Sequence, residues 1–272
     1  DIVTGAIKYF DAQVDDARHT MMIARTAARH GAVIATGVKV ESLVKEGKRV
    51  LGVKARDIES GKLITIKATA TVMCAGIWSD ELHDSFGLKA GYNVTMSKGV
   101  HIVLPKNAIK SKEGIILKTA LSVLFLIPWA DKWIVGTTDT PYIGDRRKPL
   151  AERADVEYII NEANKVLKPK LKLEDVIGVY AGLRPLVANK KDSTTTKLSR
   201  EHTVDRSAPG FVSIAGGKYT TYRVMGKDVI DLAGIELRRL IAESVTEKLP
   251  IVGADGYYAL MQQAERIAEE SG

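Results

Sequence analysis

Five short strand-like segments follow one another between Tyr92 and Asp139. Their residues have the period-two pattern and the β-branched and aromatic content of half-buried strands, and polar turn residues separate them. The expected strands are Val94–Met96, Val100–Leu104, Gly114–Lys118, Ser122–Ile127 and Lys132–Thr137. A chain with this stretch at its centre is expected to build a predominantly antiparallel sheet.

The residues before this stretch combine a helix with further strands. Carboxylates at Asp15 and Asp16 favour a helix start, and Gly31 provides a stop. Glycine-containing turns at residues 46–48 and 60–61 predict a small antiparallel meander. The expected elements are that helix, a buried strand at Ala32–Thr36, meander strands at Val38–Val44, Val50–Asp57 and Leu63–Ala68, a strand at Ala70–Gly76 and a helix at Ile77–Ser85.

The residues after Asp139 mix helices and strands without an internal repeat. The pattern predicts helices at Leu150–Leu167 and Thr220–Leu232, and strands at Val176–Leu183 and Phe211–Ile214. Together these expectations predict an α/β (α+β) chain.

Composition narrows the class of protein. With 45% hydrophobic and 27% charged residues among 272, the chain is long enough to bury a core, and no apolar run reaches the roughly 18 residues of a membrane helix. A single cysteine, Cys74, permits no intramolecular disulfide and too few thiolates for a cysteine metal site, which favours a reducing compartment. The net charge of +7 suits an anionic substrate or an acidic membrane surface. Basic residues are scattered and form no nucleic-acid-binding motif, so we expect no nucleic-acid partner.

Both ends of the sequence are expected to be cut ends of a longer chain. Asp1 stands where an initiator methionine would be, without a signal-peptide pattern, and a helical pattern from Tyr257 continues to Ser271–Gly272.

Two glycine-containing segments follow apolar strands and could admit a ligand. Gly76 ends the strand at Val72–Gly76, where a backbone can approach a flat ligand, although an ordinary turn with a packing glycine is the commoner explanation. The segment Ile214–Arg223 places two glycines and Lys218 between a strand and a helix. Backbone N–H groups at that helix start favour an anion, but the sequence is not a Walker A loop and reads equally as a generic anion-binding turn.

Three further segments carry candidate polar side chains. His101 lies in a strand and could accept a hydroxyl proton near neutral pH, although a lone histidine is more often structural. Arg184 is held extended between a strand and Pro185, where it could bind phosphate or form a surface ion pair. The cluster at residues 137–139 could line a pocket, but capping a loop is the safer local interpretation.

Taken together and in order, these segments resemble the FAD-dependent glycerol-3-phosphate dehydrogenases, a branch of the D-amino-acid-oxidase-like flavoproteins. The resemblance covers roughly residues 9–232. It rests on Val14–Arg18, Cys74–Trp78, Ser97–His101, Ile127–Trp129, Gly136–Thr140, Gly182–Pro185, Ser199–Arg200 and Gly216–Arg223. Cys74-Ala75-Gly76 departs from the Ala-Thr-Gly of many relatives, so a hydroxyl is absent there.

The resemblance implies a discontinuous FAD-binding domain and a substrate domain built on a large mixed, mostly antiparallel sheet. It assigns residues 1–91 to the FAD domain, with an N-terminal strand on the substrate side, and residues 92–183 to the substrate domain. Residues 184–232 return to the FAD domain, and residues 233–272 begin a C-terminal region. The family's G-x-G-x-x-G fingerprint is expected upstream of Asp1, so this fragment alone should bind FAD poorly and be inactive.

The resemblance also implies a reaction, the oxidation of sn-glycerol 3-phosphate to dihydroxyacetone phosphate, with hydride passing to FAD and electrons to quinone. It assigns His101, Arg184 and Lys218 as catalytic residues, and these three with Arg200 as substrate ligands. No metal site is implied. The implied FAD contacts are Ala75, Gly76, Trp78, Gly182, Gly216, Gly217, Lys218, Tyr219 and Thr220.

The implied setting is cytoplasmic, at the inner face of the cell membrane as a peripheral protein, and a homodimer stays open. A glycerophosphate oxidase with oxygen as acceptor is the nearest alternative. The alternative of another class is a non-enzymatic domain that binds phosphate through the Gly-Gly-Lys turn and Arg184.

Overall fold

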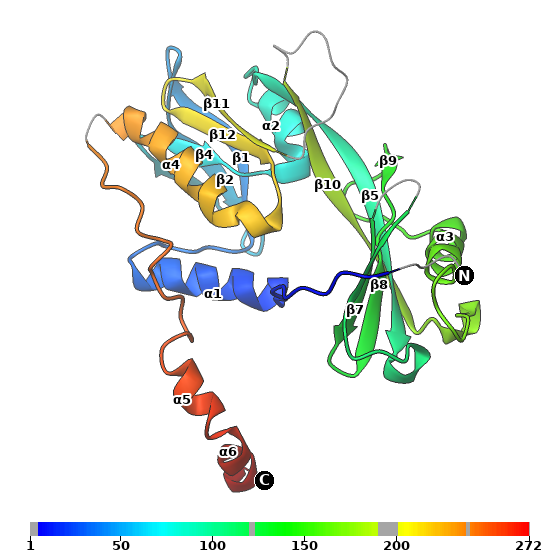
Figure 1. Ribbon diagram of the computed structural model, residues 1–272. Helices are drawn as coiled ribbons and strands as arrows, with labels where there is room; N and C mark the ends of the chain where they lie inside the picture. The colour runs from blue at the N-terminus through cyan, green and yellow to red at the C-terminus, as the bar shows by residue number, and fades with distance from the viewer. Residues whose placement is uncertain (1–4, 120–122, 190–200, 238–239, 272) are drawn as a thin grey trace.

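The computed structural model describes residues 5–119, 123–189, 201–237 and 240–271. Its largest sheet has six strands in the order β10-β5-β8-β7-β6, with β9 pairing with β5, and every pairing is antiparallel, as the sequence predicts. The strands are β5 (Tyr92–Pro105), β6 (Ile115–Lys118), β7 (Val123–Trp129), β8 (Lys132–Gly136), β9 (Thr140–Tyr142) and β10 (Gly178–Asn189). Figure 1 shows this sheet in green, with the long strands β5 and β10 running from it toward the other half of the molecule.

Helix α3 (Arg153–Ala163) covers one face of the large sheet. Alternate residues of β5, namely Val100, Ile102 and Leu104, are buried in one cluster with Ile159 of α3. Because successive side chains of a strand point to opposite faces, the residues between them, including His101, point away from α3. The second face of this sheet is therefore not covered by α3.

The two strands expected at residues 94–96 and 100–104 form a single strand, β5. The prediction of a break was wrong because the polar residues between them are satisfied inside the sheet. Lys98 is buried with its ammonium 2.8 Å from a carboxylate oxygen of Asp155, and Ser97 donates a hydrogen bond to Asp139.

A second, three-stranded sheet has the order β11-β12-β4 (His202–Ala208, Phe211–Gly216, Thr71–Met73). Strands β12 and β4 are parallel, and α4 (Tyr222–Leu237) packs on them through a buried cluster that includes Val212, Ile214 and Val229. Strand β11 was not predicted. Its polar residues show no strand pattern, and the strand forms because its backbone groups pair with those of β12.

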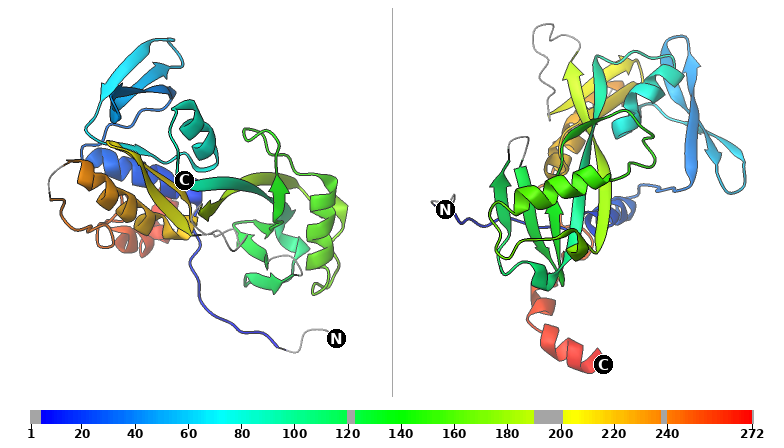
Figure 2. Two further views of the ribbon diagram at one scale, coloured as in Figure 1. Left: turned by 90° about the horizontal axis from the view of Figure 1, so that it is seen from above. Right: turned by 90° about the vertical axis from the view of Figure 1, so that its right-hand side faces the viewer.

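The predicted meander is confirmed as a third sheet of β1 (Val38–Glu46), β2 (Arg49–Asp57) and β3 (Leu63–Lys67). The predicted first helix is confirmed as α1 (Asp16–Arg29), where the Asp15 side chain accepts a hydrogen bond from the backbone N–H of Arg18. A 3-10 turn, η1 (Gly76–Trp78), leads into α2 (Ser79–Ser85), and Figure 2 shows from two sides how the three sheets are arranged.

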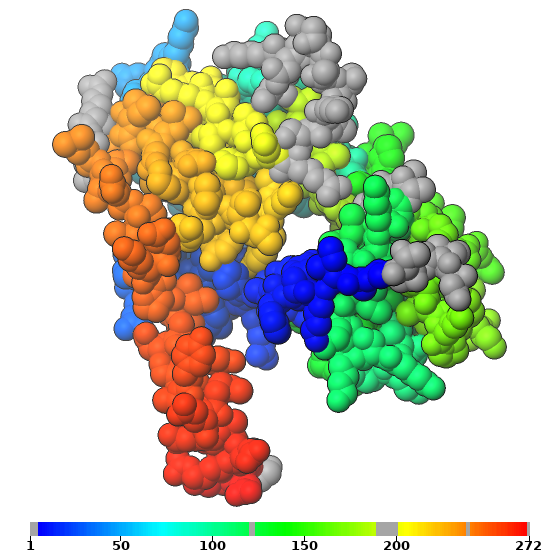
Figure 3. Space-filling view, viewed as in Figure 1, coloured from blue at the N-terminus to red at the C-terminus, as the bar shows by residue number. Residues whose placement is uncertain are grey.

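Two predicted strands are absent from the part of the chain that the structure describes. Residues 32–36 form no strand and are exposed, because no described segment lies beside them to pair with their backbone groups. The N-terminal strand expected on the substrate side is an exposed, irregular segment over residues 5–14. Hydrogen bonds from Lys8 to Glu113 and from Gln13 to the Pro128 carbonyl nevertheless hold it beside the large sheet, where it appears in blue in Figure 3.

The described C-terminal residues end in two short helices, α5 (Tyr257–Met261) and α6 (Ala264–Ser271), which project from the body in Figure 1. None of the helices described is both long and apolar enough to cross a membrane. The proposed domain boundaries stay a prediction.

Candidate active site

His101 lies in a row across three strands of the open sheet face. It is opposite Gly136 of β8 on one side and Tyr180 of β10 on the other. The imidazole stacks on the Tyr180 ring, with centroids 5.0 Å apart and an angle of 10° between the planes. On the other side it lies over Gly136, where an added Cβ would be 2.7 Å from the ring carbon Cγ. The imidazole is therefore held between an aromatic ring and a glycine backbone.

The surroundings of His101 favour its neutral form. Burial, and then the positive charge of Arg184, lower its pKa from 6.5 to about 4. Within the described part of the chain, neither ring nitrogen has a hydrogen-bond partner. A neutral imidazole has a nitrogen lone pair that can accept a proton, and the low pKa makes this one a weaker base than an ordinary histidine.

Arg184 lies on the same face as His101. It pairs with Ser97, which is separated from His101 by an even number of positions along β5. Its guanidinium rests over Gly99, where an added Cβ would be 2.6 Å from the central carbon Cζ. It donates hydrogen bonds to Thr137 Oγ1 at 2.7 Å and to the Thr138 carbonyl at 3.2 Å.

Acidic and hydroxyl groups complete the support of Arg184. A carboxylate oxygen of Asp139 is 3.7 Å from the guanidinium, and Asp139 also accepts the hydrogen bond from Ser97. Buried Thr138 accepts a hydrogen bond from the Val100 backbone. The cluster at residues 137–139, for which the sequence left a pocket or a loop cap open, thus orients the arginine.

Gly182 lies opposite Gly99, between Tyr180 and Arg184 along β10. Nothing lies within 4 Å of where its Cβ would be. Space is therefore open above the sheet between the aromatic side chain and the cation, and a small molecule there could contact both His101 and Arg184.

Most of the predicted flavin contacts lie at one edge of the second sheet, whereas Gly182 lies in β10 of the large sheet. Strands β4 and β12 are parallel, so their carboxyl ends meet at this edge, which is where α/β sheets bind ligands. Ala75, Gly76 and Trp78 follow β4, whereas Gly216 and Gly217 end or follow β12. The short helix that contains Gly76 also contacts β5 and β10 of the large sheet. This edge therefore adjoins the strands that carry His101 and Arg184.

The Gly-Gly-Lys turn needs both glycines. Gly216 and Gly217 have φ angles of 78° and 82°, a region that side chains disfavour. A Cβ on Gly216 would lie 2.6 Å from the Glu201 carbonyl oxygen. Lys218, Tyr219 and Thr220 follow as exposed residues before α4.

Contacts of Tyr219 fix this turn against α1. Its hydroxyl is 2.8 Å from His19 Nδ1 and donates a hydrogen bond to the Asp16 carbonyl at 3.2 Å. Among the described residues no hydrogen bond or ion pair joins Lys218 to His101 or Arg184. Arg200, a predicted substrate ligand, lies outside the described residues.

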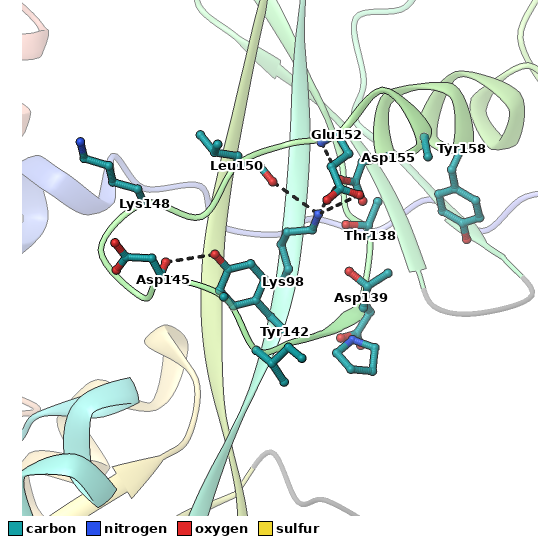
Figure 4. Close-up of a pocket in the computed structure, with 15 residues that line it drawn as sticks. Lys98, Thr138, Asp139, Tyr142, Asp145, Lys148, Leu150, Glu152, Asp155 and Tyr158 are labelled. Atoms are coloured by element: carbon teal, nitrogen blue, oxygen red, sulfur yellow. Dashed lines mark hydrogen bonds and ion pairs between the residues drawn. The ribbon is translucent and has the colours of Figure 1, made fainter.

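Two cavities differ in their relation to these residues. One of about 800 Å³ lies on the α3 face around the Lys98–Asp155 ion pair, and none of the predicted site residues lines it (Figure 4). The other, of about 760 Å³, is lined by Ala75 and Trp78 together with basic residues such as Arg146. Only the second matches a predicted contact surface. The residues described contain no cluster of three or more His, Cys, Asp or Glu side chains suited to a metal ion.

Sequence reasoning missed the residues that support His101 and Arg184. Tyr180 had no assigned role, and Gly99 and Gly136 appeared only within longer motifs. Their signal is positional: each glycine lies opposite or beside a functional side chain in a neighbouring strand, which becomes visible only once the register is known.

Comparisons with known proteins show which family the chain resembles. Residues 1–232 match the family described as FAD dependent oxidoreductase. The chain is 48% identical over 268 residues to glycerol-3-phosphate dehydrogenase 2 of Mycobacterium tuberculosis and 47% identical to glycerol-3-phosphate dehydrogenase of Mycobacterium leprae. Each match covers 98% of this chain and 46% of the relative, so the chain spans about half the length of these proteins. The structure of glycerol-3-phosphate dehydrogenase from Bacillus halodurans complexed with FAD is similar with a TM-score of 0.83 and 31% identity, over 95% of this chain and 51% of that one.

Proposed function

The chain belongs to the FAD dependent oxidoreductase family, and we propose that its complete protein oxidises sn-glycerol 3-phosphate to dihydroxyacetone phosphate. The observation that carries this proposal is the placement of His101 and Arg184 on one open, glycine-lined sheet face. Relatives named glycerol-3-phosphate dehydrogenase, with nearly half of their aligned residues identical, support the choice of substrate.

Arg184 binds the phosphate of the substrate in this proposal. Its planar fork of N–H donors matches phosphate oxygens, and its bonds to Thr137 and Thr138 restrict its orientation. An anchored phosphate holds the secondary alcohol carbon at a fixed distance from Arg184. Binding of the phosphate thereby orients the reacting carbon. Arg200 is proposed as a second phosphate ligand.

His101 accepts the proton of the secondary hydroxyl. Its imidazole is neutral at physiological pH and has a nitrogen lone pair for that proton, while its pKa of about 4 makes it a weaker base than an ordinary histidine. The carbon that bears this hydroxyl loses a hydride from its C–H bond. Loss of the hydroxyl proton and of this hydride leaves the ketone of dihydroxyacetone phosphate.

The residues present fit FAD at the edge where β4 and β12 end. Gly76 has a φ of 56° and open space where a Cβ would be, so its backbone can approach a flat ring closely. Ala75 and Trp78 line a cavity beside it. Gly182, Gly216–Thr220 and these residues would hold the cofactor, and Lys218 would place a positive charge near it. FAD, when bound, supplies the acceptor for the hydride.

We further propose quinone as the final electron acceptor and peripheral contact with the inner face of the cell membrane, from the cytoplasmic side. The net charge of +7 favours an anionic lipid surface. Oxygen as acceptor is the competing outcome. Hydrogen peroxide formed in proportion to substrate oxidised would establish an oxidase instead.

The test is an anaerobic visible spectrum of the complete protein before and after addition of sn-glycerol 3-phosphate. Bleaching of a bound flavin is expected. A flavin that stays oxidised would exclude this substrate, and a protein without bound flavin would favour the phosphate-binding domain without redox chemistry.

A further inference from the structure

The orientation of His101 is set by packing. Among the described residues its ring nitrogens have no hydrogen-bond partner, whereas most functional histidines are oriented by a bond to one nitrogen. Both flat sides of the imidazole are instead covered, one by Gly136 and one by the Tyr180 ring at 5.0 Å. Gly136 contributes only backbone atoms, so Tyr180 is the side chain that packs against the imidazole and restricts its orientation.

We propose that Tyr180 is a positioning residue for His101, stacking on the imidazole so that one ring edge faces the substrate space and water is kept from its flat side. This rests on the proposed role of His101 as proton acceptor. The register supports it, because the two residues are direct cross-strand partners, and such neighbours have Cβ atoms only about 5 Å apart. The tyrosine is also 47% exposed, so it forms the outer wall of the site and separates the imidazole from solvent.

The charged and titratable groups around this stack are few in the described residues. Strand β10 contributes Arg184 as well as Tyr180, and Asp16 at the start of α1 acts on the phenol. The β8 residue opposite His101 is Gly136, which has no charge. Burial, with a smaller contribution from Asp16, raises the pKa of Tyr180, so the ring stays neutral beside the imidazole. Burial is the larger cause of the low pKa of His101, and Tyr180 supplies part of that burial.

The experiment follows deuterium exchange at the imidazole C2 position of each histidine in the complete protein, as a function of pH, by peptide mass spectrometry. This readout needs no substrate, so it can fail independently of the proposed dehydrogenase activity, which the flavin spectrum tests. Removing the ring in Tyr180→Ala should raise the midpoint of the His101 titration by about one pH unit or more, because the desolvation is lost. Tyr180→Phe keeps the ring and should leave the midpoint unchanged.

Phe125→Ala is the matched control. Phe125 is exposed on the same sheet face and lies opposite Gly136 in β7, on the side away from His101. The Phe125→Ala variant removes an aromatic ring from the same row and leaves both His101 and Tyr180 unchanged. It should change neither the His101 titration nor turnover. His30, exposed after α1, serves as the reference peptide.

Kinetics complete the test where substrate turnover is measurable. Tyr180→Ala should lower kcat about tenfold or more while KM changes little, and Tyr180→Phe should restore kcat. An unchanged His101 midpoint in Tyr180→Ala, or a midpoint shifted equally by Phe125→Ala, would overturn the proposal.

Discussion

The imidazole of His101 lies flat against the backbone of Gly136, so closely that a methyl group on Gly136 would be 2.7 Å from Cγ of the ring and 2.8 Å from the Val100 carbonyl oxygen. Real Cβ atoms do not approach other atoms so closely. The neighbouring glycine, Gly99, has the same relation to the guanidinium of Arg184. The open face of the large sheet is therefore shaped by two glycines on which two functional side chains rest.

Gly136→Ala should accordingly displace the imidazole. We expect kcat to fall roughly 10- to 100-fold, since a displacement of about 1 Å at a reacting group has effects of this size. Stopped-flow measurement of flavin reduction by sn-glycerol 3-phosphate is the readout. Gly178→Ala is the control, because its Cβ would make an ordinary 3.5 Å contact with Val103 in the same sheet. Equal rates in the two variants would contradict the packing argument.

The pH dependence of catalysis follows from the low pKa of His101. A proton acceptor must be neutral, so the acid limb of kcat/KM should lie near pH 4 rather than near 6.5, provided that free substrate ionisation is corrected for. Stability has a matching sign. The folded pKa is below the unfolded value, so His101 contributes no destabilisation above pH 6.5 and destabilises the fold as pH falls from 6.5 toward 4. In His101→Asn this part of the stability profile should be missing in denaturant titrations.

Arg184→Ala tests the phosphate contact. Loss of the guanidinium should raise KM for sn-glycerol 3-phosphate by about 100-fold, whereas activity toward free glycerol should barely change, because a charge-assisted pair is worth roughly 2 to 3 kcal/mol. The same variant removes a positive charge near His101, so the acid limb should move upward in pH. Equal losses on both substrates would exclude the phosphate role, and an unmoved acid limb would contradict the coupling between the two residues.

The sequence predicted elements whose signals are local and missed relations that depend on register. The meander, α1 and the antiparallel sheet follow from periodicity, turn glycines and Asp15. The strand expected at residues 32–36 failed because an apolar run needs a neighbour to pair with, and none of the described segments provides one. Likewise His101 and Arg184 could be named from the sequence, but Tyr180 could not, since its role exists only because strand pairing puts it opposite His101.

The Gly-Gly-Lys turn offers a final test with an internal control in the following helix. Gly216→Ala places a Cβ 2.6 Å from the Glu201 carbonyl oxygen and gives a residue with a side chain a φ of 78°. Because the oxygen belongs to the backbone, relieving this contact requires a backbone shift. We expect it to lower the unfolding free energy by about 2 kcal/mol or more and to release FAD from the complete protein. Gly226→Ala lies inside α4 with nothing within 4 Å of its Cβ, and it should stabilise by up to about 1 kcal/mol through helix propensity. Thermal unfolding and the fluorescence of released flavin measure both effects. Retention of FAD by a folded Gly216→Ala protein would show that the left-handed turn is not required for cofactor binding.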